Sequence, residues 1–175
     1  MMFTALQQPG PTAVRYPRGT GPGATVKPHP VALPIGKAEI ISDGDEVAIF
    51  GLGALLPLGQ QLAAELRQQG FSAAVINPRF VKPLDRDVLA EYARRVGVIV
   101  TLEDHVLMGG FGSAVLEALS EMQLEVPVVR IGWPDRFIEH GKVDQLRAKY
   151  GISVEAAMEK LAPYLLKTRK RLIAH

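Results

Sequence analysis

The sequence contains no cysteine, so disulfide bonds, thiolate metal ligands and thiol catalysis are excluded. It also has no apolar run approaching the ~18 residues that a helix needs to cross a bilayer. The first residues do not show the basic and then apolar order of a signal peptide. We therefore expect a cytoplasmic protein without membrane contact.

The residues that are present are typical of a globular domain. The chain has 175 residues, 47% hydrophobic and 22% charged, which is enough to enclose one sizeable core. The net charge is +2, and Lys167, Arg169, Lys170 and Arg171 crowd the C-terminus. Because no aromatic residues are interleaved with these cations, we interpret residues 167–175 as a basic tail at a solvated helix end and expect no nucleic-acid partner.

The first 34 residues differ in composition from the rest. Met1–Gln8 has the apolar spacing of a helix end and stops at Pro9–Pro11, and Thr12–Tyr16 resembles a short strand. Residues 20–34 have few large apolar side chains, which predicts an extended linker and a domain boundary. A helix end at the start suggests that the chain is a piece of a longer protein.

From residue 35 onward, strand patterns and helix patterns alternate. This alternation predicts an α/β fold: a three-layer sandwich with a mostly parallel five-stranded sheet that includes one antiparallel strand. The turn Ser42–Asp45 is of a kind that joins antiparallel strands, so residues 35–41 should pair with residues 46–50. Asp85 is placed to cap a helix, and Pro163 should kink or split the last one.

Two glycine-rich turns follow predicted strands. Gly51-Leu52-Gly53 has the context of a dinucleotide-binding turn, but Leu56 replaces the third glycine and the next strand ends at Asn77 instead of an acid. Gly109–Gly112 precedes another helix, whose backbone N–H groups could hold an anion. We favour a tight turn at the first site and close helix packing at the second.

A third polar cluster, Glu103-Asp104-His105, lies at a predicted strand end. These groups could form a metal site or an acid–base pair, but neighbours on an extended chain point in different directions and no further ligand lies at suitable spacing. Polar contacts with a partner domain are the favoured interpretation. His29, His140 and His175 have no nucleophile arrangement nearby, so we expect no catalytic triad.

Arg18 is the candidate binding residue. It lies between Pro17 and Gly19, so its backbone is fixed on one side and open on the other, which suits bidentate capture of a phosphate or carboxylate. Arg15 lies three positions away and would face the opposite side of a strand. From local chemistry alone, a surface ion pair explains Arg18 equally well.

Five motifs in consistent order, from about Met1 to Gly151, resemble a known family. They are similar to the C-terminal part of transketolase-like, thiamine-diphosphate-dependent enzymes, in particular those that condense pyruvate with glyceraldehyde 3-phosphate. The motifs are Gly10–Gly19, Leu33–Lys37, Arg79–Asp85, Met108–Val115 and Ile131–Asp135.

The resemblance implies a domain division and a role. Residues 1–19 would end the middle, pyrimidine-binding domain, residues 20–34 would be a linker, and residues 35–166 would form the transketolase C-terminal domain. The complete enzyme would be a homodimer that releases CO2 and makes a 1-deoxy sugar phosphate for isoprenoid, thiamine and pyridoxal synthesis. By its match to the family motif, Arg18 would bind the phosphate of glyceraldehyde 3-phosphate.

The same resemblance places the thiamine diphosphate and the Mg²⁺ between the two preceding domains, which would be the partners of this chain. We assign no catalytic, cofactor-binding or metal-binding residue here, and we expect the chain alone to bind no cofactor and to be inactive. It would be part of a transferase, cut from the complete synthase or encoded separately. Two alternatives stay open: a non-catalytic binding or regulatory α/β module, and the C-terminal domain of another transketolase-like enzyme.

Overall fold

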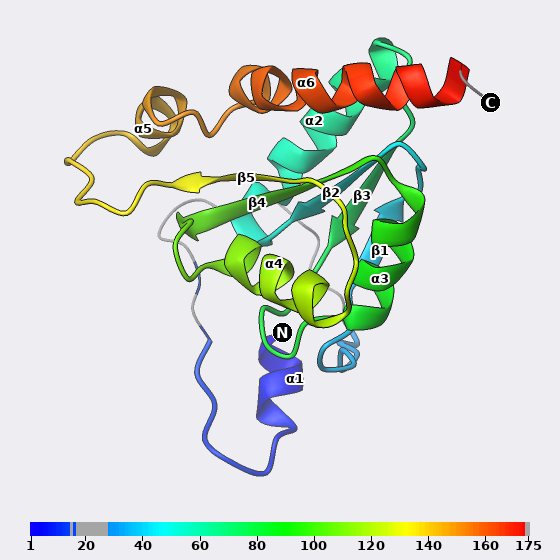
Figure 1. Cartoon of the computed structure of the whole chain (residues 1–175). Coiled ribbons are helices and arrows are strands. Elements are labelled where there is room, and N and C mark those ends of the chain that lie inside the picture. Colours follow the sequence, from blue (N-terminus) through cyan, green and yellow to red (C-terminus); the bar gives the residue numbers. More distant parts are fainter. Residues whose placement is uncertain (15, 17–27, 174–175) are drawn as a thin grey trace.

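A five-stranded sheet forms the centre of the molecule (Figure 1). The structure is a computed structural model that describes residues 1–14, 16 and 28–173, with side chains up to residue 166. The spatial order of the strands is β1-β3-β2-β4-β5; β2 to β5 are parallel, and β1 is antiparallel to β3. The predicted sheet is therefore confirmed. The strands are β1 (Glu39–Ser42), β2 (Val47–Gly51), β3 (Ala73–Asn77), β4 (Val98–Val106) and β5 (Val128–Trp133).

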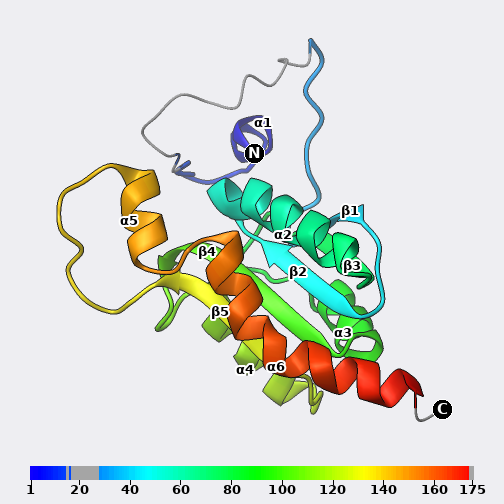
Figure 2. The same ribbon diagram turned by 90° about the horizontal axis from the view of Figure 1, so that it is seen from above.

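Helices cover both faces of this sheet, which gives the three predicted layers (Figures 1 and 2). One face carries α2 (Leu56–Gln68) and α6 (Val154–Ile173), and the other carries α3 (Arg86–Arg95) and α4 (Phe111–Glu121). Three short elements lie around the layers: α1 (Met2–Leu6), the 3₁₀ turn η1 (Gly53–Leu55) and α5 (Val143–Lys149). No helix in the described part of the chain is long and apolar enough to span a bilayer.

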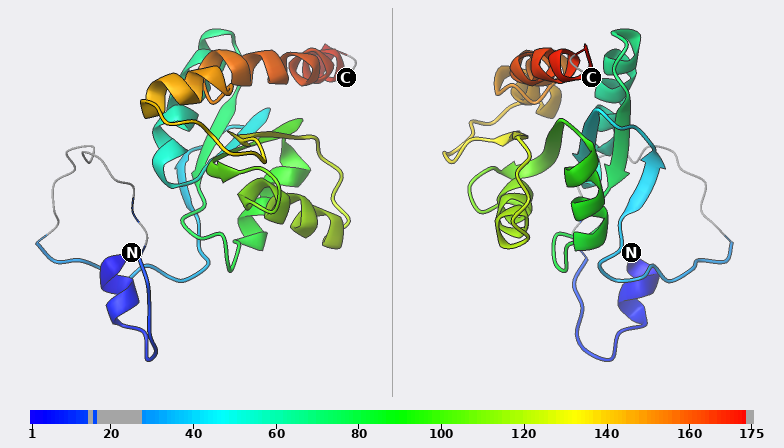
Figure 3. Two further views of the ribbon diagram at one scale, coloured as in Figure 1. Left: turned by 90° about the vertical axis from the view of Figure 1, so that its left-hand side faces the viewer. Right: turned by 45° about the vertical axis from the view of Figure 1, so that its right-hand side comes forward.

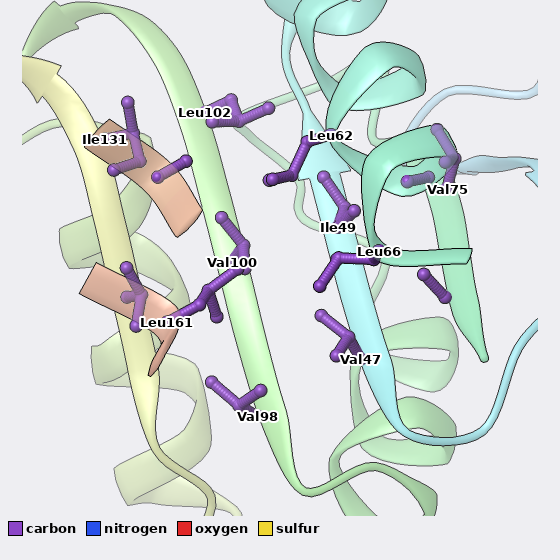
Figure 4. Packing of buried hydrophobic residues seen from close by; sticks show 14 of the residues in the cluster. Val47, Ile49, Leu62, Leu66, Val75, Val98, Val100, Leu102, Ile131 and Leu161 are labelled. Atoms are coloured by element: carbon purple, nitrogen blue, oxygen red, sulfur yellow. The ribbon is translucent and has the colours of Figure 1, made fainter. Parts of the chain in front are cut away.

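The core has two halves because side chains alternate across each strand. Val47 and Ile49 of β2 pack towards α2, where Leu62 and Leu66 meet them (Figure 4). Ala48 and Phe50 of β2 face α3 and α4 on the other side of the sheet. All five residues of β2 are buried, as expected for a central parallel strand covered on both faces.

The pairing predicted from the turn at Ser42–Asp45 is wrong. β1 pairs with β3, so that Glu39 lies opposite Asn77, and β3 separates β1 from β2. The connection between β1 and β2 crosses the start of β3 so closely that a Cβ on Gly44 would lie 2.4 Å from the carbonyl carbon of Ala73. Both edges of β2 are instead occupied by parallel partners, β3 and β4.

Of three further local predictions, the first two need correction. The first strand begins at Glu39 and not at residue 35, because Gly36 lies in a turn with a positive φ of 76°. Of the predicted strand Thr12–Tyr16, the described residues 12–14 and 16 form no strand. Pro163 lies inside α6 without splitting it, and Figure 2 shows this helix changing direction along its length, which agrees with the predicted kink.

Candidate functional site

The carboxyl ends of β2, β3, β4 and β5 meet at one edge of the sheet because these strands are parallel. Open α/β sheets bind ligands at this edge, at the point where the connections from two neighbouring strands run in opposite directions along the sheet. Here that point lies between β2, which leads to α2, and β4, which leads to α4. The turns after these two strands are therefore the first places to look for a site.

The turn after β2 is packed against its own chain. A Cβ on Gly51 would lie 2.9 Å from the Cα of Leu56, and Gly53 has a φ of +56°. The N–H of Leu52 donates to the carbonyl oxygen of Leu102 at 2.9 Å. These contacts confirm the tight turn that was favoured over a nucleotide-binding loop.

The turn after β4 contains a buried carboxylate, Glu103, whose exposed fraction is 0%. Glu103 accepts hydrogen bonds from the backbone N–H groups of Phe111 at 2.6 Å and Gly112 at 2.8 Å. These donors have no partner within the helix, and a negative charge is favourable at a helix N-terminus. Glu103 therefore occupies the place that an anion would take at the start of α4.

Glycines provide the space for this carboxylate. A Cβ on Gly110 would lie 2.1 Å from Oε2 of Glu103, and one on Gly132 would lie 3.0 Å from its Cγ. A Cβ on Gly112 would lie 2.7 Å from Oγ1 of Thr101. The close packing predicted for Gly109–Gly112 is confirmed, and an external anion would have to displace Glu103.

Asp104, the next residue, joins β4 to β5 and α5. Its carboxylate accepts hydrogen bonds from Nε1 of Trp133 at 2.8 Å and from the guanidinium of Arg147 at 2.7 Å. The ring of Trp133 in turn meets the ring of Tyr150 edge-on, with centroids 5.8 Å apart. Glu103 and Asp104 thus make contacts within the chain, and the polar contacts that we expect between this cluster and a partner domain stay a prediction.

His105 completes this polar cluster. It is exposed, and its Nδ1 lies 3.0 Å from the carbonyl oxygen of Val106. Among the described residues, no three His, Asp or Glu side chains gather where they could hold a metal ion. Because both neighbouring carboxylates are engaged, the cluster does not fit a metal or diphosphate site. His29 and His140 are exposed, and His175 lies outside the described residues.

Arg18, the predicted phosphate-binding residue, and Arg15 lie outside the described residues. The structure does describe how the segment before them is held. Thr4, the buried residue of α1, accepts a hydrogen bond on its hydroxyl oxygen from the N–H of Leu33 at 2.8 Å. A cavity of about 370 Å³ separates α1 from Ile35 and Phe80. Figure 3 shows α1 outside the three layers of the sandwich.

The segment 79–85, which follows β3, makes hydrogen bonds and ion pairs with the start of the sheet domain. The sequence analysis did not predict this role. Asp85 caps α3 as predicted, accepting from the N–H of Val88 at 3.3 Å, and also accepts from the N–H of Ala38 at 2.9 Å. Lys37 pairs with Asp85 and Asp87, and its hydrogen bond to Asp87 is the main cause that raises the pKa of Lys37. The Lys37–Asp85 contact links residues 48 positions apart.

A second polar cluster lies at the opposite edge of the sheet, where β2 and β3 begin. The hydroxyl of Tyr92 donates to Asp43 at 2.8 Å, and Arg95 lies over the Tyr92 ring and pairs with Asp43. Burial, followed by the bond to Asp43, raises the pKa of Tyr92 to about 12. This cluster lies away from the carboxyl ends of the strands, so we infer that its role is to hold α3 against the β1–β2 connection.

In the described part of the chain, the sheet order and the turns after β2 and β4, which are packed against the chain itself, define a three-layer α/β domain. Comparison with known proteins gives the particular family. The chain belongs to the transketolase C-terminal domain family, whose model, "Transketolase, C-terminal domain", matches residues 36–156.

Two curated relatives are both named 1-deoxy-D-xylulose-5-phosphate synthase. The protein from Acidobacterium capsulatum is 68% identical over 168 residues, which cover 96% of this chain and 27% of that protein. The protein from Methylacidiphilum infernorum is 60% identical over 159 residues, which cover 91% of this chain and 25% of that protein. The chain therefore spans about a quarter of the length of these relatives.

A solved structure described as "Split gene transketolase, inactive beta4 tetramer" shares both fold and sequence with the chain. The TM-score is 0.70 and the identity is 34%, over 78% of this chain and 43% of that chain. This similarity agrees with the family found from the sequence and with the mostly parallel sheet.

Proposed function

We propose that the chain is the C-terminal portion of a 1-deoxy-D-xylulose-5-phosphate synthase. That enzyme condenses pyruvate with glyceraldehyde 3-phosphate to 1-deoxy-D-xylulose 5-phosphate and CO2. The observation that carries the proposal is the 68% identity to a synthase of that name over 96% of this chain. The complete protein would be a cytoplasmic transferase that serves isoprenoid, thiamine and pyridoxal synthesis.

The domains that precede this portion would hold the cofactors. Decarboxylation of pyruvate needs an electron sink, which thiamine diphosphate supplies when it is bound with Mg²⁺. Glu103 and Asp104 are engaged within the fold, which supports a cofactor site elsewhere in the complete enzyme. The thiamine-binding and pyrimidine-binding domains and a second subunit would then be the partners, and the chain alone would be inactive.

We assign residues 1–19 to the end of the pyrimidine-binding domain, residues 20–34 to a linker, residues 35–166 to the transketolase C-terminal domain and residues 167–175 to a basic tail. The position of α1 outside the three layers supports the first boundary (Figure 3). The family match over residues 36–156 supports the third assignment. The contact between Thr4 and Leu33 would then join the two domains on either side of the linker.

Within this arrangement, we assign Arg18 to the phosphate of glyceraldehyde 3-phosphate. A guanidinium presents a planar fork of N–H donors that matches phosphate oxygens. Binding energy from the phosphate, which does not react, would position the aldehyde carbon for attack. The support is the motif Pro17-Arg18-Gly19, which matches the family pattern.

Steady-state kinetics of Arg18→Ala in the complete protein tests this assignment. We expect KM for glyceraldehyde 3-phosphate to rise roughly tenfold or more, because a hydrogen bond to a charged group contributes about 1.5–3 kcal/mol. KM for pyruvate should stay unchanged. Arg94→Ala, at an exposed position on α3, is the matched control and should change neither constant. An unchanged KM for the aldehyde in Arg18→Ala would reject the assignment.

A further inference from the structure

Thr4 is an unusual residue to be buried in α1. This helix exposes larger apolar side chains, Met2 at 66% and Leu6 at 79%, whereas the polar Thr4 is only 4% exposed. The hydroxyl oxygen of Thr4 accepts the N–H of Leu33 at 2.8 Å, across 29 positions of sequence. Buried hydroxyl groups are stable where they have a hydrogen-bond partner. The burial of Thr4 therefore follows from its contact with the segment that leads into the sheet domain.

Residues 12–14 turn back towards α1. The hydroxyl of Thr12 lies 3.5 Å from a carbonyl oxygen of this helix, and residues 12–14 line one cavity together with Thr4. Arg18 is the fourth residue after Val14 in the sequence, and four residues of chain reach at most about 14 Å. The place of α1 and residues 12–14 therefore limits where Arg18 can lie.

The segment that begins at Leu33 is packed against the sheet domain. A Cβ on Gly36 would lie 2.7 Å from Cγ of Pro83, and the N–H of Ala38 donates to Asp85 at 2.9 Å. Asp85 is buried and also caps α3. Movement of the segment would therefore leave a buried carboxylate without one of its donors, which is unfavourable. Leu33 is thus attached to a well-packed corner of the sheet domain.

The hydrogen bond between Thr4 and Leu33 joins these two parts of the chain, and Arg18 lies between them in the sequence. A contact that closes a loop lowers the conformational freedom of the residues inside it, and a pre-positioned group loses less entropy on binding. We propose that Thr4 is a positioning residue for Arg18, which keeps its guanidinium within reach of the phosphate of glyceraldehyde 3-phosphate.

This inference rests on the phosphate-binding role proposed above for Arg18. It gives the sheet domain, in which we assign no catalytic residue, a part in binding the aldehyde substrate. The connection runs from the corner at Asp85 through Leu33 to Thr4 and α1. Chains of packed and hydrogen-bonded groups of this kind can couple distant parts of a protein.

Steady-state kinetics of Thr4→Val in the complete protein tests the proposal. Valine keeps the shape of threonine but cannot accept the N–H of Leu33. We expect KM for glyceraldehyde 3-phosphate to rise about three- to tenfold, with kcat and KM for pyruvate unchanged. Thr4→Ser keeps the hydroxyl and should retain the original KM. Thr12→Val is the matched control, because Thr12 is exposed and its contact of 3.5 Å is weak.

The double variant Thr4→Val with Arg18→Ala separates positioning of the arginine from a general loss of structure. If Thr4 acts through Arg18, the double variant should have the same KM for the aldehyde as Arg18→Ala, because no guanidinium remains to be misplaced. An equal fold increase on adding Thr4→Val to either background would overturn the proposal.

Hydrogen–deuterium exchange of the complete protein tests the hydrogen bond itself without any assay of turnover. The N–H of Leu33 should exchange about tenfold faster in Thr4→Val than in Thr12→Val. Unchanged exchange in Thr4→Val would overturn the inference. If Arg18→Ala raises KM for the aldehyde and Thr4→Val does not, the inference fails while the proposed function stands. A complete protein that makes no 1-deoxy-D-xylulose 5-phosphate would overturn both.

Discussion

The buried carboxylate of Glu103 occupies the N-terminus of α4 at the carboxyl edge of the sheet. Glu103 accepts two N–H groups at the start of α4, and the glycines around it leave room for no other group. The packing of these glycines could be predicted from their place before a helix. The burial of the Glu103 side chain could not be predicted. Because β4 is covered on both faces, its sequence has no polar–apolar alternation that would show which of its acidic side chains is buried.

Replacing Glu103 by Gln should lower the free energy of unfolding by about 2 kcal/mol. The amide keeps the shape but loses the charge, and its NH2 group is a donor placed against backbone donors. Urea denaturation measures the change. Glu117→Gln is the control, because Glu117 lies at an exposed position on α4, the helix whose N-terminus Glu103 contacts, and it should alter stability little. Equal losses in the two variants would show that Glu103 does not stabilise α4.

At the scale of the elements, local sequence patterns predicted the positions of the strands but not the pairing of β1. Alternation identified the strands and helices, but the Ser42–Asp45 turn gave the wrong partner for β1. A turn determines which strands pair only when no other strand lies between the two strands that it connects. Here β3, which begins 22 residues after the end of β2, lies between β1 and β2. The close approach of Gly44 to Ala73 is a long-range contact that sequence spacing does not reveal.

The contact of α3 with the β1–β2 connection should make stability depend on pH. Tyr92 titrates near 12 in the folded chain and near 10 when unfolded, so folding favours its neutral form. That contribution is complete below pH 10 and is lost as the pH rises through about 12. Tyr92→Phe should cost about 1 kcal/mol at pH 7, from the lost hydrogen bond, and should make the decline in alkali less steep.

Denaturation curves collected from pH 7 to 12 measure this effect. Tyr16→Phe is the matched control, because Tyr16 is 82% exposed and should keep the stability profile of the unsubstituted chain. Parallel profiles for the unsubstituted chain and Tyr92→Phe would contradict the assignment of Tyr92.

At the scale of the whole molecule, the sheet domain is joined to two projecting parts, which are α1 and the segment 134–150 that contains α5 (Figures 1 and 3). The family could be predicted from motifs such as Arg79–Asp85, whose residues contact β1, α3 and the start of the sheet domain. The exposure of Phe137 could not be predicted, because it is a property of packing and leaves no periodic signal in the sequence. The phosphate-binding role of Arg18 stays a prediction.

Product analysis is the most direct test of the account. The complete protein and the 175-residue chain would each be incubated with pyruvate, glyceraldehyde 3-phosphate, thiamine diphosphate and Mg²⁺. The account predicts 1-deoxy-D-xylulose 5-phosphate and CO2 from the complete protein and neither from the chain alone. Product from the chain alone, or none from the complete protein, would contradict it.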